Sequence, residues 1–212
     1  METGVLIYNA QGNLMKLRGT QQGAAHVVQA APSLSKWVQE GKVWQAIETT
    51  ATAFVIALPT TTAGFSMYND EPDTGKWYVV LGALAWQAAN AATQASWGIA
   101  HQVSSVKPAT KPTADLAAAT IVKGLRANMG TYNGRAIFDL ALSVADDRWA
   151  PVSGSVNTVV VSLSGTQLYI PLAVPVHLPP GGVYSVEGIA SAVDITGKLG
   201  FVWAEVYRDE LE

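Results

Sequence analysis

The sequence predicts an all-β fold: a jelly-roll-like antiparallel β-sandwich with an N-terminal β-hairpin arm and one short helix. Short runs rich in Val, Ile, Trp and Tyr recur along most of the chain, and turn-forming residues such as the Pro-Pro-Gly-Gly run at 179–182 separate them. Short strands separated at regular intervals by turn-forming residues are typical of β-sandwiches and β-barrels. The 212 residues suit one sandwich with a short appendage and are few for two full domains.

Residues 1–32 are predicted to form the arm, and residues 33–212 the sandwich body. Two short apolar runs, at 5–8 and 14–18, flank the turn-forming segment 9–13, which is the spacing of a hairpin with a five-residue loop. Segment 24–29 is expected to be a third extended piece. An isolated hairpin is only marginally stable in water, so we expect it to dock on its own body, on a neighbouring subunit or on another protein.

The helix is predicted directly after the arm. Ser33 is a candidate N-cap, while Leu34, Trp37 and Val38 share one helical face. Gly41 follows the last turn, where glycine commonly ends a helix. The segment is about two turns long, so it is expected to be a connector.

From residue 43 onward the pattern is that of β-strands. They are expected at 43–48, 53–58, 65–69, 77–86, 97–103, 121–125, 136–144, 158–163, 168–170, 174–178, 183–189 and 199–207. The segment 112–119 is expected to begin a further short helix. Strand 136–144 alternates between apolar and polar residues, which indicates one wet face. Strands 77–86 and 199–207 are apolar on both faces, so each is either covered within the chain or buried at a subunit interface.

Only 14% of the residues are charged, against roughly a quarter in a typical soluble domain. A surface so poor in charge is expected to be buried in part against partners, which predicts a homo-oligomer, a dimer or a trimer. The alternative is a monomer with a neutral surface of Ser, Thr and Gln. The candidate interface residues come from the arm and from strand tryptophans: Val5, Ile7, Tyr8, Leu14, Leu17, Arg18, Trp77, Trp86 and Trp203.

Charge and hydropathy narrow the range of partners. The net charge is −3 and no Lys/Arg run occurs, so no nucleic-acid partner is expected. No apolar run is long enough to span a membrane, and residues 1–4 lack the pattern of a secretory signal, so neither membrane insertion nor secretion is expected. The chain contains no cysteine, which excludes disulfides and thiolate chemistry.

The sequence offers no clear catalytic motif. His26, His101 and His177 lie far apart, and His101 shares a strand face with apolar residues, which favours a packed, hydrogen-bonded histidine over a metal ligand. The adjacent Asp146 and Asp147 are expected in a solvated turn, and the loop 69–73 in an exposed acidic turn, with weak calcium binding as the alternative. No nucleophile elbow, P-loop or dinucleotide-binding motif is present. We therefore expect no enzyme, no cofactor and no metal site.

Several segments resemble virion proteins of tailed bacteriophages. They are IYNAQG at 7–12, LRGTQQGAAHV at 17–27, SWGIA at 96–100, VHLPPGG at 176–182 and FVWAEV at 201–206. The resemblance rests on packing and turn motifs and carries no catalytic residues. It implies a jelly-roll capsid decoration (cement) protein or a related head or tail component, located in the virion and assembled in the host cytoplasm.

Three functions follow from the sequence as hypotheses. The first is a decoration protein that stabilises a phage head through contacts with copies of itself and with the major capsid protein or other virion proteins. The alternative is a receptor- or glycan-binding module of a phage tail or fibre, which requires a concave, exposed aromatic pair. The third is an enzyme on the same scaffold, which requires an acid/base or metal cluster that the linear sequence does not reveal.

Overall fold

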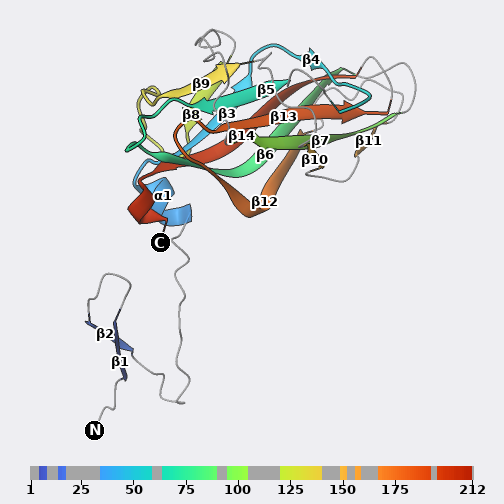
Figure 1. Ribbon diagram of the computed structural model, residues 1–212. Coiled ribbons are helices and arrows are strands. Elements are labelled where there is room, and N and C mark those ends of the chain that lie inside the picture. Colours follow the sequence, from blue (N-terminus) through green and yellow to red (C-terminus); the bar gives the residue numbers. More distant parts are fainter. Residues whose placement is uncertain are drawn as a thin grey trace.

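The structure is a computed structural model that describes residues 5–8, 14–17, 34–58, 64–89, 95–104, 120–139, 149–151, 156–158, 167–191 and 195–211. Its elements include two β-sheets stacked as the two layers of a sandwich (Figure 1). All strand pairs in both sheets are antiparallel, which confirms the predicted all-β, jelly-roll-like sandwich.

Sheet I contains the strand order β10–β7–β13–β5–β9, and β11 also pairs with β7. Its strands are β5 (Phe65–Asn69), β7 (Ala95–Ser104), β9 (Ala136–Asp139), β10 (Ala150–Pro151), β11 (Val156–Thr158) and β13 (Val183–Ala190).

Sheet II contains the order β12–β6–β14–β3–β8, and β4 pairs with β14. Its strands are β3 (Val43–Glu48), β4 (Thr52–Ala53), β6 (Trp77–Ala89), β8 (Thr120–Gly124), β12 (Gln167–Leu178) and β14 (Thr196–Val206). The chain also forms helix α1 (Leu34–Gln39) and a terminal 3₁₀ turn η1 (Arg208–Glu210).

The predicted hairpin is confirmed. β1 (Val5–Tyr8) pairs with β2 (Leu14–Leu17), and the register sets Val5 opposite Leu17 and Ile7 opposite Met15. These two strands form a separate sheet that includes none of the sandwich strands. Residues 18–33, which contain the predicted third extended piece and the candidate cap Ser33, lie outside the described residues.

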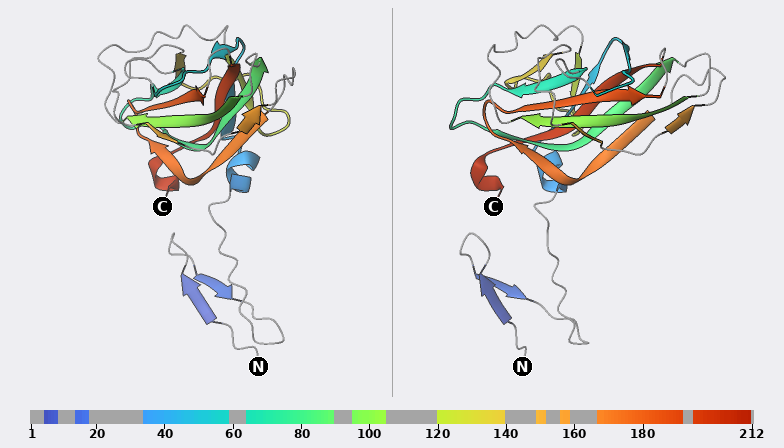
Figure 2. Two further views of the ribbon diagram at one scale, coloured as in Figure 1. Left: turned by 90° about the vertical axis from the view of Figure 1, so that its right-hand side faces the viewer. Right: turned by 45° about the vertical axis from the view of Figure 1, so that its right-hand side comes forward.

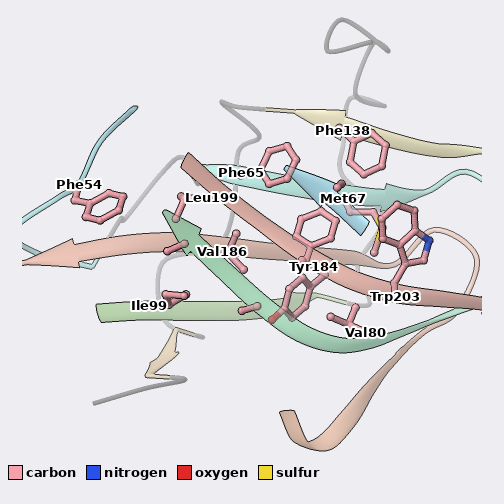
Figure 3. Packing of buried hydrophobic residues seen from close by; sticks show 14 of the residues in the cluster. Phe54, Phe65, Met67, Val80, Ile99, Phe138, Tyr184, Val186, Leu199 and Trp203 are labelled. Atoms are coloured by element: carbon pink, nitrogen blue, oxygen red, sulfur yellow. The ribbon is translucent and has the colours of Figure 1, made fainter. Parts of the chain in front are cut away.

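The main core lies between the sheets and is rich in aromatic side chains (Figure 3). Phe201 stacks on Phe65 with ring centroids 4.9 Å apart, and Trp203 meets Phe138 edge-on at 5.7 Å. At the far end of the core Phe54 packs against Trp97. Aromatic pairs in these geometries add to the stabilisation that burial alone provides.

A second apolar cluster lies on the outer face of sheet II, beneath α1. Trp37 of the helix is buried against Val43, Val79, Val202, Ala204 and Val206. This contact explains why β6 and β14 are apolar on both faces: over this part of the sheet they are covered within the chain, which is one of the two predicted alternatives. Leu34, predicted to share one helical face with Trp37, is the first residue of the helix and is half-exposed.

One predicted strand is wrong in its extent. The segment predicted as a strand over 53–58 crosses from one sheet to the other after β4. The Phe54 N–H donates to Ile195 O beside sheet II, and the next N–H, that of Val55, donates to Gly188 O in sheet I. A segment that joins both layers in succession cannot continue as one strand, so it closes this end of the sandwich. Of the predicted strand 136–144, the structure describes only the β9 part; the predicted helix at 112–119 and the pair Asp146–Asp147 are outside the described residues.

Candidate functional site

The structure separates the nine predicted interface residues. Five of them lie in the hairpin strands β1 and β2, and Arg18 is outside the described residues. Trp203 is fully buried in the core, so its side chain offers no surface to a partner, in contrast to the interface role predicted for it. Trp86 is 42% exposed on the outer face of sheet II, and Trp77 lines a pocket at one end of the sandwich.

The outer face of sheet II carries a row of apolar positions across five strands, which we call the apolar row. The register sets Tyr169 of β12 opposite Leu84 of β6, Leu84 opposite Gly200 of β14, Gly200 opposite Ile47 of β3, and Ile47 opposite Ile121 of β8. Because side chains alternate between the two faces of a strand, all five positions face away from the core.

The apolar row is open at both ends. Tyr169 is 51% exposed and Ile121 is 45% exposed, and Trp86 lies one pleat further along β6. Lys198 and Lys123 flank the row on the same face. Helix α1 covers the neighbouring part of this face through Trp37. The outer face of sheet II is therefore half covered by the chain itself and half exposed, and the exposed half is a candidate interface.

A second surface feature is a pocket of about 660 Å³ at the end of the sandwich where the chain finishes. Three segments form it: the β5–β6 loop, the β12–β13 turn and η1. Figure 2 shows η1 at this end, next to the C-terminus. Trp77 and the 54% exposed Tyr207 are its aromatic lining, and the Arg208 guanidinium lies 6.0 Å from the centre of the Trp77 ring. The pocket is concave and has an exposed aromatic side chain.

Inside the core, near the same end, a buried glutamate organises a polar cluster. Glu205 of β14 accepts hydrogen bonds from the Tyr132 hydroxyl and, at 3.4 Å, from the Trp203 indole N–H. Lys76 pairs with it at 3.3 Å. Burial raises the pKa of the Tyr132 hydroxyl, and the nearby Tyr78 and Glu205 raise it further. The hydroxyl therefore stays protonated and remains a hydrogen-bond donor. The cluster ties the β8–β9 connection and the β5–β6 loop to β14.

Two further buried carboxyl groups lie at the opposite end. Burial raises the pKa of Glu48 to about 8, with the charge of Glu187 adding to the shift and a hydrogen bond from Thr52 opposing it. Burial raises the pKa of Glu187 to about 7, opposed by the backbone N–H groups of Gly64 and Gly188. Glu48 follows the inward positions of β3, whereas Glu187 lies between the inward positions Val186 and Gly188 of β13. Glu187 is close enough for its charge to act on Glu48, and neither carboxyl lines the pocket.

Two further polar candidates from the sequence, His101 and Asp70, have structural partners. The His101 ring lies 3.3 Å from the Tyr184 hydroxyl, and burial lowers its pKa, which agrees with the predicted packed, hydrogen-bonded histidine. In the acidic loop, Asp70 pairs with Arg135 at 3.5 Å. Among the residues that the structure describes, no group of three or more His, Asp or Glu side chains is placed to hold a metal ion.

Comparison with known proteins finds no family model that matches the chain, no similar curated protein and no similar solved structure. In the described part of the chain, no helix combines the length and hydropathy that a membrane span requires.

The main surface residues could not be identified from the sequence, because their proximity depends on strand pairing and tertiary packing. Tyr169 and Ile121 lie in short strands that were predicted, but only the cross-strand register brings them into one row with Leu84 and Ile47. Tyr207 and Arg208 follow the last strand, and their proximity to the β12–β13 turn is a tertiary feature. No local sequence pattern carries either signal.

Proposed function

We propose that this chain is a structural protein of a tailed-bacteriophage particle: a decoration (cement) protein that joins copies of itself and contacts the major capsid protein. The observation that carries this proposal is the exposed half of the outer face of sheet II. A contiguous exposed apolar surface is typical of a site of protein association. The low charge of the whole chain, 14%, supports the same conclusion.

The hairpin supplies the second support. In the β1–β2 register, positions Val5, Ile7, Met15 and Leu17 share one face of the ribbon, and all four are apolar. A two-stranded ribbon with such a face gains stability by docking onto another surface. As an arm outside the sandwich sheets, it suits attachment to a capsid shell or to a neighbouring subunit, and repeated weak contacts around a symmetric particle add up to strong retention.

The interface is tested by a pair of matched substitutions. Ile121→Lys places a charge in the apolar row, whereas Ile56→Lys makes the same change at a residue that is 64% exposed and lies outside sheet II. We expect the purified wild-type protein to be a dimer or trimer by light scattering, Ile121→Lys to shift it toward the monomer, and Ile56→Lys to leave the mass unchanged. A monomeric wild type, or equal effects of both substitutions, contradicts the proposed interface.

The location is tested separately. Immunogold labelling of purified virions of the phage that encodes the chain is expected to mark the head surface. Label confined to the tail fibres favours the receptor-binding alternative, and virions without the protein exclude a structural role in the particle.

A further inference from the structure

The pocket at the end of the sandwich has walls that are held in place by buried polar contacts. Asn69, at the end of β5, is fully buried. Its side-chain amide donates to Lys76 O and to Leu178 O, each at 3.1 Å, and its carbonyl oxygen accepts from Glu71 N–H. One side chain thus joins the β5–β6 loop to the start of the β12–β13 turn, which form two of the pocket's walls.

The backbone completes this connection. Asn69 N–H donates to Gly182 O, and Gly181 N–H donates to Asn69 O. Within the turn, Gly182 N–H donates to Pro179 O and Gly181 has φ +82°, the geometry of a type II turn with Pro180 in the second position. The turn presents two proline rings to the pocket, and their surfaces are rigid and apolar.

The third wall, η1, is anchored as well. Glu210 accepts the Tyr207 N–H at 2.9 Å through one carboxyl oxygen and pairs with Lys42 of the α1–β3 connection through the other. Lys42 also pairs with Glu40. Glu210 and Lys42 therefore hold the segment that carries Tyr207 and Arg208 in place, so the pocket is formed before any ligand binds.

The pocket lining contains both flat apolar surfaces and hydrogen-bonding groups. Trp77, Tyr207 and the proline rings supply flat apolar surface, while Asp73 and Asp209 supply exposed acceptors and Arg208 supplies donors. A ligand that matches this lining has apolar C–H faces and hydroxyl groups that both donate and accept. The volume, about 660 Å³, lies within the range of small-molecule sites, roughly 300–1,000 Å³.

We propose that this pocket binds a neutral saccharide, with Tyr207 against the sugar ring, Trp77 beneath the Arg208 guanidinium, and Asp73, Asp209 and Arg208 on the sugar hydroxyl groups. A cationic ligand, which also suits an aromatic and acidic pocket, is disfavoured because the Arg208 guanidinium already lies over the Trp77 ring. This inference does not depend on the proposed decoration function, because the pocket does not include the apolar row.

The test titrates the full-length protein with cellobiose, maltose, lactose and N,N′-diacetylchitobiose at millimolar concentrations. Saturation-transfer NMR and tryptophan fluorescence report binding. We expect at least one sugar to bind, and Tyr207→Ala to weaken its affinity at least tenfold, or about 1.4 kcal/mol. The matched control is Tyr169→Ala, which removes a tyrosine of nearly equal exposure, 51% against 54%, from outside the pocket.

A second variant guards against a folding artefact. Asp73→Asn changes only an exposed loop carboxyl of the lining and is expected to weaken binding of the same sugar while the unfolding temperature stays that of the wild type. The proposal is overturned if none of the four sugars binds, if choline chloride binds in their place, or if Tyr169→Ala weakens binding as much as Tyr207→Ala does.

Discussion

Glu48 is a carboxyl group held inside the sandwich, 1% exposed, with Thr52 as a hydrogen-bond donor at 3.3 Å to one of its oxygens. Its other oxygen, Oε1, has no hydrogen-bond partner among the residues that the structure describes. Burial disfavours the charged form, which is why its pKa rises from 4.5 to about 8. Folding therefore takes up a proton at this site between these two pH values.

Glu48 is expected to make the stability of the protein depend on pH. The folded protein binds this proton more tightly than the unfolded chain, so the free energy of unfolding falls as pH rises from about 4.5 to about 8. Glu48→Gln removes this dependence. We expect the variant to be more stable than the wild type at pH 9, by up to about 5 kcal/mol from the pKa shift, and to differ little at pH 4. Urea unfolding at the two pH values measures the difference.

Glu71→Gln serves as the control for that experiment, because Glu71 lies in the β5–β6 loop and is partly exposed. It should follow the wild-type pH profile. Glu187, whose pKa is raised to about 7 for the same reason, remains in both variants and retains its own decline in stability toward high pH. A Glu48→Gln profile that parallels the wild type would show that Glu48 does not carry the linked proton.

At the scale of single residues, the sequence predicted the packing environment of His101, but it did not predict which strand tryptophans are exposed for an interface. The strand-face argument placed His101 correctly among packed neighbours. The same kind of argument could not separate Trp203, which is in the core, from Trp86, which is on the surface, because both lie in strands that are apolar on two faces. Which face is covered depends on α1, and its docking site is set by tertiary packing.

At the scale of elements, helix α1 ends in a Schellman motif. Lys42 N–H donates to Trp37 O at 2.9 Å and Gly41 N–H donates to Val38 O at 3.0 Å. Gly41 has φ +73°, a left-handed conformation that residues with a Cβ adopt at a cost of about 1–2 kcal/mol. The sequence predicted this helix end from the glycine alone.

Replacement of Gly41 by alanine is expected to destabilise the protein because of this left-handed conformation. A Cβ on Gly41 would meet no atom closer than 3.6 Å, so the cost of Gly41→Ala comes from the backbone and not from a clash. We expect a loss of about 1 kcal/mol in the free energy of unfolding, measured by chemical denaturation. Gly130→Ala is the matched control, since a Cβ there would meet nothing within 4 Å and its φ is not in the left-handed region. It is expected to be neutral or slightly stabilising.

Strand positions were largely predictable, and their pairing order was not. The bounds of β3 and β5 match the predicted 43–48 and 65–69, because clear turn residues flank both strands. The order β12–β6–β14–β3–β8 joins strands from distant parts of the sequence, and local periodicity contains no information on such pairing. The apolar row is a product of this order, which is why the candidate interface emerged only from the structure.

For the molecule as a whole, the relation between the hairpin and the sandwich decides how the chain assembles. β1 and β2 pair with each other, and neither joins a sandwich sheet. If the arm serves attachment to other molecules, a chain that begins at residue 33 should keep the stability of its sandwich, within about 0.5 kcal/mol, because few of the arm's contacts would contribute to folding.

We therefore expect the truncated chain 33–212 to unfold at the same urea concentration as the full chain. Its number of subunits per oligomer, measured by light scattering, should also be that of the full chain, because the apolar row is retained. Its co-sedimentation with phage heads should be lost, because the apolar ribbon face formed by Val5, Ile7, Met15 and Leu17 is removed. A marked drop in unfolding midpoint would mean that the arm packs on its own sandwich. Undiminished binding to heads would assign attachment to the sandwich surfaces instead, and the exposed half of sheet II would then have to serve both self-association and docking.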